Sequence, residues 1–534
     1  MSPLIKETGI FPERQSESET ADYVGNFDAG DRARLVSQGA FNYIGQIASV
    51  LSSIILVPFM LLRLGAEAYG FWIVALATPA FAAGIDNALY LSITRETALH
   101  RDAERVIDGP TSAFLSAACG AYAVFGLLCG VLIVATGMQM APHLHLSAAI
   151  QTATPTIFTA VAIAFAAGRA VTFSNAVLAG FQRFGTINAI SVGAMLVRFV
   201  GFALLLQFHC SLAAIAICYA IVSIAECLIA TWFSYRLGAL RADSSLFQWK
   251  LLNRISEFGI SSFLTTLLQN VWWFSPPIML GFFTGGTSAT TSLYAGQRPC
   301  FIVSELNWRG AEVLFSASAA EEGRGGDKTY ADIIVFGTKC VLSVAMPFCI
   351  GLVILAPVLV NVWLRIARPE TVIVMQLTSI GVIADALWVG PLHALWGRGM
   401  ARQVLFITAA MTALLLLLNA SLIPRFGVAS VALAFTLSAW LGAIITTVYA
   451  AREFKYSWPR FLLCSFSDVA LPSASLIAFT LVVRAFFPDH PLLLLFVAAI
   501  GGGIVYAMLF WIQQRFLKNS FNPLSLLFRN WKRS

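Results

Sequence analysis

The chain has little charge for its length. Only 11% of its 534 residues are Asp, Glu, Lys or Arg, whereas soluble globular proteins carry about 25%. Hydrophobic residues make up 58%, and the mean hydropathy is +0.79. This composition excludes an ordinary soluble domain and predicts a polytopic membrane protein.

Several chemical signatures are also absent from the sequence. It contains no GxxxxGK[ST] loop, which excludes an ATP-driven pump built on one. The nine cysteines stand singly in apolar segments without CxxC spacing, so neither disulfides nor a metal site is predicted. The loops between apolar segments are too short to hold an external catalytic site. We therefore expect a secondary transporter rather than an enzyme, with no cofactor other than a proton or sodium gradient.

Fourteen apolar segments are long enough to cross a bilayer as helices, which takes about 20 residues each. They predict an all-α polytopic fold with about 14 transmembrane helices. The segments are 39–62, 69–93, 111–136, 154–181, 186–208, 211–233, 258–283, 288–319, 333–364, 371–395, 403–423, 427–450, 468–487 and 492–511.

The basic residues are distributed unevenly over the two sides of these segments. Of the 34 Lys and Arg, 24 fall on the side of the N-terminus, 5 on the opposite side and 5 within helices. Because cytoplasmic loops are enriched in basic residues, both termini are predicted to be cytoplasmic. The polar first 33 residues accordingly predict a cytoplasmic tail rather than a removable signal peptide. The net charge of +7 is explained by this topology and gives no indication of nucleic-acid binding.

Two stretches recur at nearly the same interval. Residues 41–58 match 258–276 at an offset of 217 to 218, and 206–219 match 421–434 at an offset of 215. The repeat predicts two six-helix lobes related by a pseudo-two-fold axis, with two C-terminal helices outside them. The expected domains are 1–33 (tail), 34–237 (first lobe), 238–256 (linker), 257–451 (second lobe), 452–513 (loop and last two helices) and 514–534 (basic tail).

Four charged residues lie on one face of segment 288–319. Glu305, Arg309 and Glu312 follow Arg298 by 7, 11 and 14 residues, which brings all four within roughly 40° of one line on a helix. One interpretation is that two intrahelical ion pairs form, Glu305 with Arg309 and Arg309 with Glu312. Arg298 then has no acidic partner within one turn. The favoured interpretation is a cavity lining, because a charge that faces lipid costs about 2.5 to 3.5 kcal/mol.

Bulky polar residues mark three other segments. Asn42 and Gln46 lie on one face of the first, and Gln269 and Asn270 lie on the repeat-related seventh. Such residues either pack helices together through hydrogen bonds or line a wet cavity, and we favour the cavity. Asp86, in the second segment, is a candidate for ion coupling because its carboxylate can be desolvated and rehydrated during a cycle.

The remaining intramembrane charges differ in what they predict. Arg198 and Glu226 are interpreted as a structural ion pair between the fifth and sixth segments. Arg169 has no obvious local partner and is a cavity candidate. Asp385 is isolated among apolar residues and is a second coupling candidate. Lys339 lies near a segment end, where its amine can reach the interface.

Three passages resemble a known family. Residues 61–98 (LLRLGAEAYGFWIVALATPAFAAGIDNALYLSITRETA), 177–190 (VLAGFQRFGTINAI) and 422–440 (LIPRFGVASVALAFTLSAW) are similar to bacterial polysaccharide transporters. These are the Wzx-type lipid-linked oligosaccharide flippases of the multidrug/oligosaccharidyl-lipid/polysaccharide (MOP) exporter superfamily. Asp86 occupies the acidic position of the family's D-x-G motif, although two of the family's glycines are replaced. The resemblance covers residues 35–450.

The resemblance implies a MOP/MATE-like fold and a flippase in the bacterial inner membrane. Its cargo would be an undecaprenyl-pyrophosphate-linked oligosaccharide for exopolysaccharide or O-antigen synthesis, with a polysaccharide polymerase and glycosyltransferases as partners. Arginine's planar guanidinium suits a pyrophosphate, so Arg298, Arg309 and Arg169 are the candidate headgroup ligands. Two alternatives stay open, a cation-coupled multidrug antiporter of the same superfamily and a membrane scaffold for polysaccharide enzymes.

Overall fold

The chain folds into long helices, and the part that the computed structural model describes contains no strand. That part comprises residues 29–85, 90, 93, 94, 96, 97, 109–237, 260–322, 327–365 and 368–516. Among these described residues, eleven helical spans are apolar and long enough to cross a membrane by length and composition. The protein is therefore a multi-pass membrane protein, as the composition predicts.

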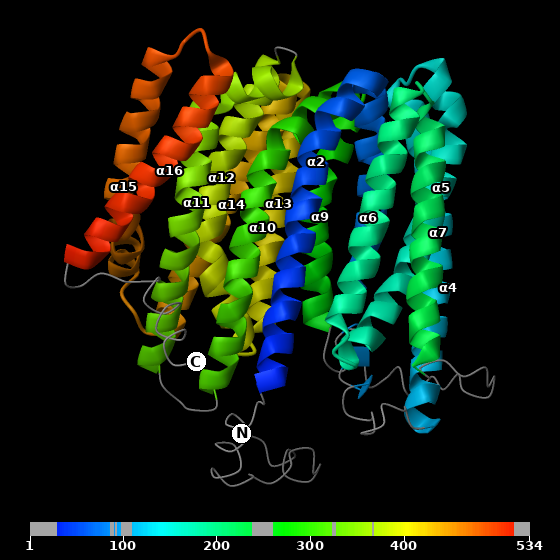
Figure 1. Ribbon diagram of the computed structural model, residues 1–534, viewed down its shortest axis with the longest axis horizontal. Helices are drawn as coiled ribbons and strands as arrows, with labels where there is room; N and C mark the ends of the chain where they lie inside the picture. Colours follow the sequence, from blue (N-terminus) through cyan, green and yellow to red (C-terminus); the bar gives the residue numbers. More distant parts are fainter. Residues whose placement is uncertain are drawn as a thin grey trace.

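The first lobe consists of the helices before residue 237 (Figure 1). They are α2 (Ala29–Ala77), the 3₁₀ segment η2 (Thr78–Ile85), α4 (Gly109–Met140), the 3₁₀ turn η3 (Ala141–Leu144), α5 (Ala148–Gly180), α6 (Phe184–Gln207) and α7 (Leu212–Arg236). Helix α2 is interrupted at Gly65, whose φ of 82° and ψ of 168° are non-helical. The first two predicted segments, 39–62 and 69–93, both include parts of α2, and Ser52–Phe81 is one apolar span.

The second lobe and the two C-terminal helices follow residue 259. The lobe contains α9 (Ile260–Thr284), α10 (Ser288–Glu322), α11 (Asp327–Leu364), α12 (Pro369–Gly397), α13 (Ala401–Phe426) and α14 (Val428–Glu453). Outside it lie α15 (Trp458–Phe486) and α16 (Pro491–Phe516), which pack mainly on α11 and form one side of the molecule in Figure 1.

The two lobes repeat the same packing. Helix α5 packs on α4 and α7 in the first lobe, and α12 packs on α11 and α14 in the second. Likewise α6 packs on α2 as α13 packs on α9. The turn after α5 recurs 217 residues later, since Arg183 N donates to Leu178 O at 2.9 Å and Met400 N donates to Leu395 O at 3.0 Å. The predicted fold of two six-helix lobes with two additional helices is confirmed.

Helices α9 and α10 are not among the eleven apolar spans. Helix α10 carries Arg298, Glu305 and Arg309, and α9 carries Gln269 and Asn270, all within lengths that cross the bundle. A helix this polar is stable within a membrane when its polar face lies against protein or water. The lower hydropathy of α9 and α10 is thus consistent with polar faces that lie against the interior of the molecule.

An ion pair fastens the C-terminal helices to the second lobe. Lys339 Nζ of α11 lies 2.9 Å from Asp468 Oδ2 of α15, and the two side chains are 12% and 9% exposed. Ser467 Oγ donates to Asp468 Oδ1 at 3.3 Å, and Gln513 Nε2 of α16 donates to Ser467 O at 2.9 Å. The amine of Lys339 thus has an acidic partner 129 residues away, which the sequence did not indicate.

The lobes are joined at the end where α9 passes into α10. Thr287 Oγ1 donates to Glu67 O and Thr291 Oγ1 donates to Ala66 O, both at 2.7 Å. The approach is so close that a Cβ on Gly70 would lie 1.8 Å from Thr287 O. Nearby, His145 Nδ1 donates to Gly285 O at 2.9 Å. We call these contacts the inter-lobe seal.

The first half of α2 is bound to the second lobe in two further places. Trp363 Nε1 of α11 donates to Ile54 O at 2.8 Å, and Arg298 Nε of α10 donates to Ser53 Oγ at 3.2 Å. Beyond Gly65, the second half of α2 packs on the first lobe, where the Phe71 ring meets that of Phe158 in α5 at 5.9 Å. Helix α2 thus contacts both lobes.

Candidate functional site

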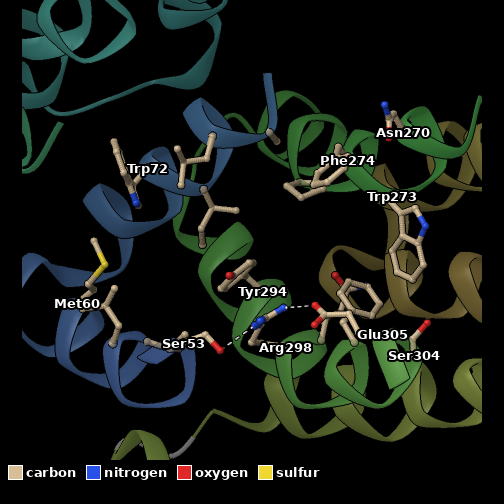
Figure 2. A pocket seen from close by; sticks show the side chains of 18 of the residues that line it. Ser53, Met60, Trp72, Asn270, Trp273, Phe274, Tyr294, Arg298, Ser304 and Glu305 are labelled. Carbon is tan, nitrogen blue, oxygen red and sulfur yellow. Dashed lines mark hydrogen bonds and ion pairs between the residues drawn. The ribbon is translucent and has the colours of Figure 1, made fainter. Parts of the chain in front are cut away.

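A cavity of about 870 Å³ lies between the two lobes. Both halves of α2, together with α6 and α7, line it from the first lobe, and α9 and α10 line it from the second. Figure 2 shows side chains of α2, α9 and α10 around it. On α10 the lining extends from Tyr294 to Arg309, which is about 22 Å along a helix axis. The interface between lobes is where the repeat predicted a polar lumen.

Arg298 projects into this cavity from α10 (Figure 2). Its Nη1 lies 2.9 Å from Glu305 Oε1, with side-chain exposures of 16% for Arg298 and 41% for Glu305, and its Nε donates to Ser53 Oγ. The sequence interpretation left Arg298 without an acidic partner because it searched only one turn of helix. The pairing here spans seven residues, or two turns, which the long guanidinium side chain can bridge.

Two other arginines line the cavity. Arg309 is exposed and lies eleven residues after Arg298, about 16 Å along the same helix. Arg198 of α6 approaches Glu226 of α7 at 3.4 Å, and its Cζ lies 4.8 Å from the Tyr219 ring centroid. The geometry matches the predicted structural pair of Arg198 with Glu226. It also adds a role that the sequence did not predict, because Arg198 faces the cavity.

Aromatic side chains form much of the wall. They account for nine of the 26 lining residues, compared with 12% of the whole chain. The nine are Tyr69, Trp72, Phe202, Tyr219, Trp273, Phe274, Tyr294, Phe301 and Trp308. Tyr294, Phe301 and Trp308 recur at intervals of seven residues on the face of α10 that carries its charges. A search of this helix face for aromatic as well as charged residues would have identified these three rings from the sequence.

Neutral polar groups lie among these rings. Gln269 and Asn270 of α9 line the cavity, as their position in the repeat predicts. Within the described part of the chain, the buried Nε2 of Gln269 has no hydrogen-bond partner. Ser304 and Gln297 of α10 also line the cavity.

Asp385 lies one layer behind the cavity wall. Its side chain is buried, with 1% of the residue exposed. It accepts hydrogen bonds from Ser304 Oγ at 2.7 Å, Trp308 Nε1 at 3.1 Å and Asn307 Nδ2 at 3.4 Å. All three donors belong to α10, and Ser304 and Trp308 line the cavity. Asp385 of α12 is therefore linked to the cavity through the side chains of the neighbouring helix.

Other candidates lie elsewhere or outside the description. The Cζ of Arg169 lies 4.4 Å from the Phe165 ring centroid, and its side chain faces Gly126 of α4 rather than the inter-lobe cavity. Asp86 falls outside the described residues. Asn42, Gln46 and Glu312 lie on described helices, but their side chains are outside the description.

Comparison with known proteins gives matches in structure only. No protein-family model matches the sequence, and no curated protein matches it. A structure of the lipid II flippase MurJ in an inward closed conformation superposes with a TM-score of 0.71 at 13% identity, and covers 90% of this chain and 99% of its own. An inward-facing multidrug resistance MATE transporter of the MOP superfamily gives a TM-score of 0.61 at 11% identity, with 77% and 98% covered. A mutant of the Vibrio cholerae MATE transporter VcmN gives 0.56 at 11%, with 79% and 98% covered. The fold is that of the MOP-superfamily transporters.

Within this MOP fold, the described cavity lining is chemically mixed. It contains three arginines and one carboxylate, Glu305. Arg298 is ion-paired with Glu305, and Arg198 is ion-paired with Glu226. The rest of the lining is aromatic, aliphatic or neutral polar. Such a site can hold a ligand that has both an anionic part and a part without charge.

Proposed function

We propose that the protein is a flippase that moves an undecaprenyl-pyrophosphate-linked oligosaccharide from the cytoplasmic to the periplasmic leaflet of a bacterial inner membrane. It would act by gradient-driven alternating access, as a secondary transporter rather than an enzyme. The observation that carries the proposal is the excess of arginine in the inter-lobe cavity. Among the described lining residues, three arginines face one carboxylate.

Arginine in this position suits a pyrophosphate headgroup. The guanidinium presents five N–H donors in a planar fork that binds phosphate oxygens two at a time. The described hydrogen bonds of Arg298 involve its Nε and Nη1, so further donors on the same fork are available to a ligand. Arg309, about 16 Å further along α10, would be a second binding site for an anion that passes through the cavity.

The predicted topology indicates which side of the membrane the seal closes. With the N-terminus in the cytoplasm, as the basic residues predict, the inter-lobe seal at Thr287 and Thr291 lies on the periplasmic side. The structure then corresponds to a state that is closed toward the periplasm. A headgroup would enter from the cytoplasmic leaflet and leave after the seal opens.

Two carboxylates are the candidates for ion coupling. Asp385 is buried behind the wall and is hydrogen-bonded to cavity residues, so a proton or sodium ion taken up there would change the hydrogen bonding of Ser304 and Trp308. Asp86 remains a candidate from its sequence position alone.

A multidrug antiporter is the second candidate function. The specific observation in its favour is the aromatic wall beside Glu305, whose side chain is 41% exposed. Aromatic faces and a carboxylate are the groups that attract organic cations. The three lining arginines count against this assignment, because carboxylates and aromatic faces rather than guanidinium groups attract organic cations.

The experiment is complementation of a strain that lacks the gene. We expect Arg298→Ala and Arg309→Ala to reduce surface polysaccharide and to leave lipid-linked intermediates on the cytoplasmic side, and the Arg→Lys variants to retain part of the function because lysine keeps the charge but loses the fork. The exposed Arg402, which lies at the start of α13 outside the cavity lining, is the matched control. Normal polysaccharide in both alanine variants, together with drug efflux by the wild type, would favour the antiporter.

A further inference from the structure

The second-lobe wall of the cavity combines stacking surfaces with neutral hydrogen-bonding groups. Trp273 of α9 is half-buried and lies in the cavity wall, where the Phe301 ring meets it edge-on at 4.8 Å and 86° (Figure 2). Behind it, Trp272 packs at 4.7 Å and donates through Nε1 to Ser438 Oγ at 3.1 Å. These contacts fix the ring that faces the cavity.

A second ring is fixed in the same way. Trp308 of α10 donates through Nε1 to Asp385 at 3.1 Å, and its ring packs edge-on against Trp388 at 5.7 Å and 86°. Trp273, Trp308 and Gln269 also border one small gap of about 10 Å³ behind the wall. The three side chains are therefore neighbours, although they come from two helices.

The amides beside these rings are placed for hydrogen bonding to a ligand. Asn270 and Gln269 precede Trp273 by three and four residues, so all three lie on one face of α9. In the described part of the chain, Gln269 Nε2 is a buried donor without a partner. Both amides line the cavity, so hydrogen-bonding groups stand beside the two rings.

We propose that this wall is a sugar-binding subsite, in which pyranose rings stack on Trp273 and Trp308 and their hydroxyls bond to Gln269 and Asn270. The inference rests on the proposed flippase function. The C–H groups of a sugar ring carry partial positive charge and are attracted to the negative face of an aromatic ring. The pyrophosphate is repelled by that face and bound by the arginines. The two parts of the cargo thus occupy different parts of one cavity.

The test compares two lipids on the full-length protein in nanodiscs by native mass spectrometry. One is undecaprenyl pyrophosphate, and the other is the same lipid with N-acetylglucosamine attached to its pyrophosphate. We expect the wild type to bind the sugar-bearing lipid about tenfold more tightly. Trp273→Ala should abolish this preference and leave the affinity for the bare lipid unchanged. The lipid-exposed Trp511 provides the matched control, and Trp511→Ala should change neither affinity.

Two milder variants protect the test against misfolding. Trp273→Phe should keep part of the preference because it keeps an aromatic face. Gln269→Ala should reduce the preference about threefold without lowering the unfolding temperature, since its Nε2 has no partner in the described structure. Equal wild-type binding of both lipids, or equal loss of both in Trp273→Ala, would overturn the subsite and leave the flippase function standing. Binding of neither lipid, with binding of tetraphenylphosphonium instead, would overturn both.

Discussion

Replacing Gly70 with alanine should open the inter-lobe seal. The added Cβ would lie 1.8 Å from Thr287 O and 2.6 Å from Thr287 C, whereas ordinary contacts are 3.4 Å or longer. Both obstacles are backbone atoms, so no side-chain rotation relieves the clash, and the backbones must separate by about 1.5 Å. That movement stretches the two 2.7 Å hydrogen bonds from Thr287 and Thr291 beyond the usual limit.

The magnitude follows from the bonds that are lost. At about 1 kcal/mol each, two hydrogen bonds amount to about 2 kcal/mol, or a roughly thirtyfold shift toward the opened seal. Hydrogen–deuterium exchange can follow this shift at the amide of Thr290, which donates to Thr287 O at 3.1 Å. We expect this amide to exchange up to about thirtyfold faster in the Gly70→Ala variant.

Gly286 offers a matched control in the same connection. A Cβ there meets nothing within 4 Å, so Gly286→Ala should leave exchange unchanged. If Gly70→Ala kept wild-type protection, or if both variants lost it equally, the close packing of Gly70 on Thr287 would not be what holds this end of the lobes together.

Three further predictions concern carboxylates. Lys339→Met should lower the unfolding free energy by about 3–5 kcal/mol because it leaves Asp468 buried without its cation. The double variant Lys339→Met, Asp468→Leu should recover most of this loss. Equal thermal stability of the single and double variants would refute a stabilising role for the pair. Asp385→Asn should abolish gradient-driven transport in proteoliposomes while insertion stays normal, and an undiminished rate would leave Asp385 a purely structural acceptor. Asp86→Asn should likewise abolish gradient-driven transport. If only one of the two variants loses transport, the residue replaced in that variant is the coupling site.

Sequence periodicity was sufficient for the features that depend on one helix at a time. It predicted the crossings, the repeat and the polar faces, including the presence of Arg298, Arg309 and Gln269 at the inter-lobe cavity. These properties follow from the 3.6-residue turn and the length of the apolar runs. The kink at Gly65 separates two segments that sequence analysis already counted as two helices.

Contacts between helices were not predictable in the same way. Lys339 with Asp468, and Asp385 with Ser304, join residues 129 and 81 positions apart, and their meeting depends on which helix faces lie together. Arg169 shows the opposite error. It has the residue type of a cavity ligand, but the rotation of α5 directs it toward Gly126 of α4. A single sequence gives the angular position of a residue on its helix without the orientation of that helix in the bundle.

The interruption of α2 at Gly65 has a mechanical consequence. Ser53 and Ile54 before it are bonded to the second lobe, and Phe71 beyond it packs on the first, so one covalent segment is attached to both rigid bodies. When the bonds at Ala66 and Glu67 are broken, rotation of one lobe against the other requires a change at only a few backbone dihedrals near Gly65. We therefore expect Gly65 to be the hinge of this rotation. A Cβ there would meet no atom within 4 Å, so the φ of 82° rather than lack of space is what favours glycine at this joint.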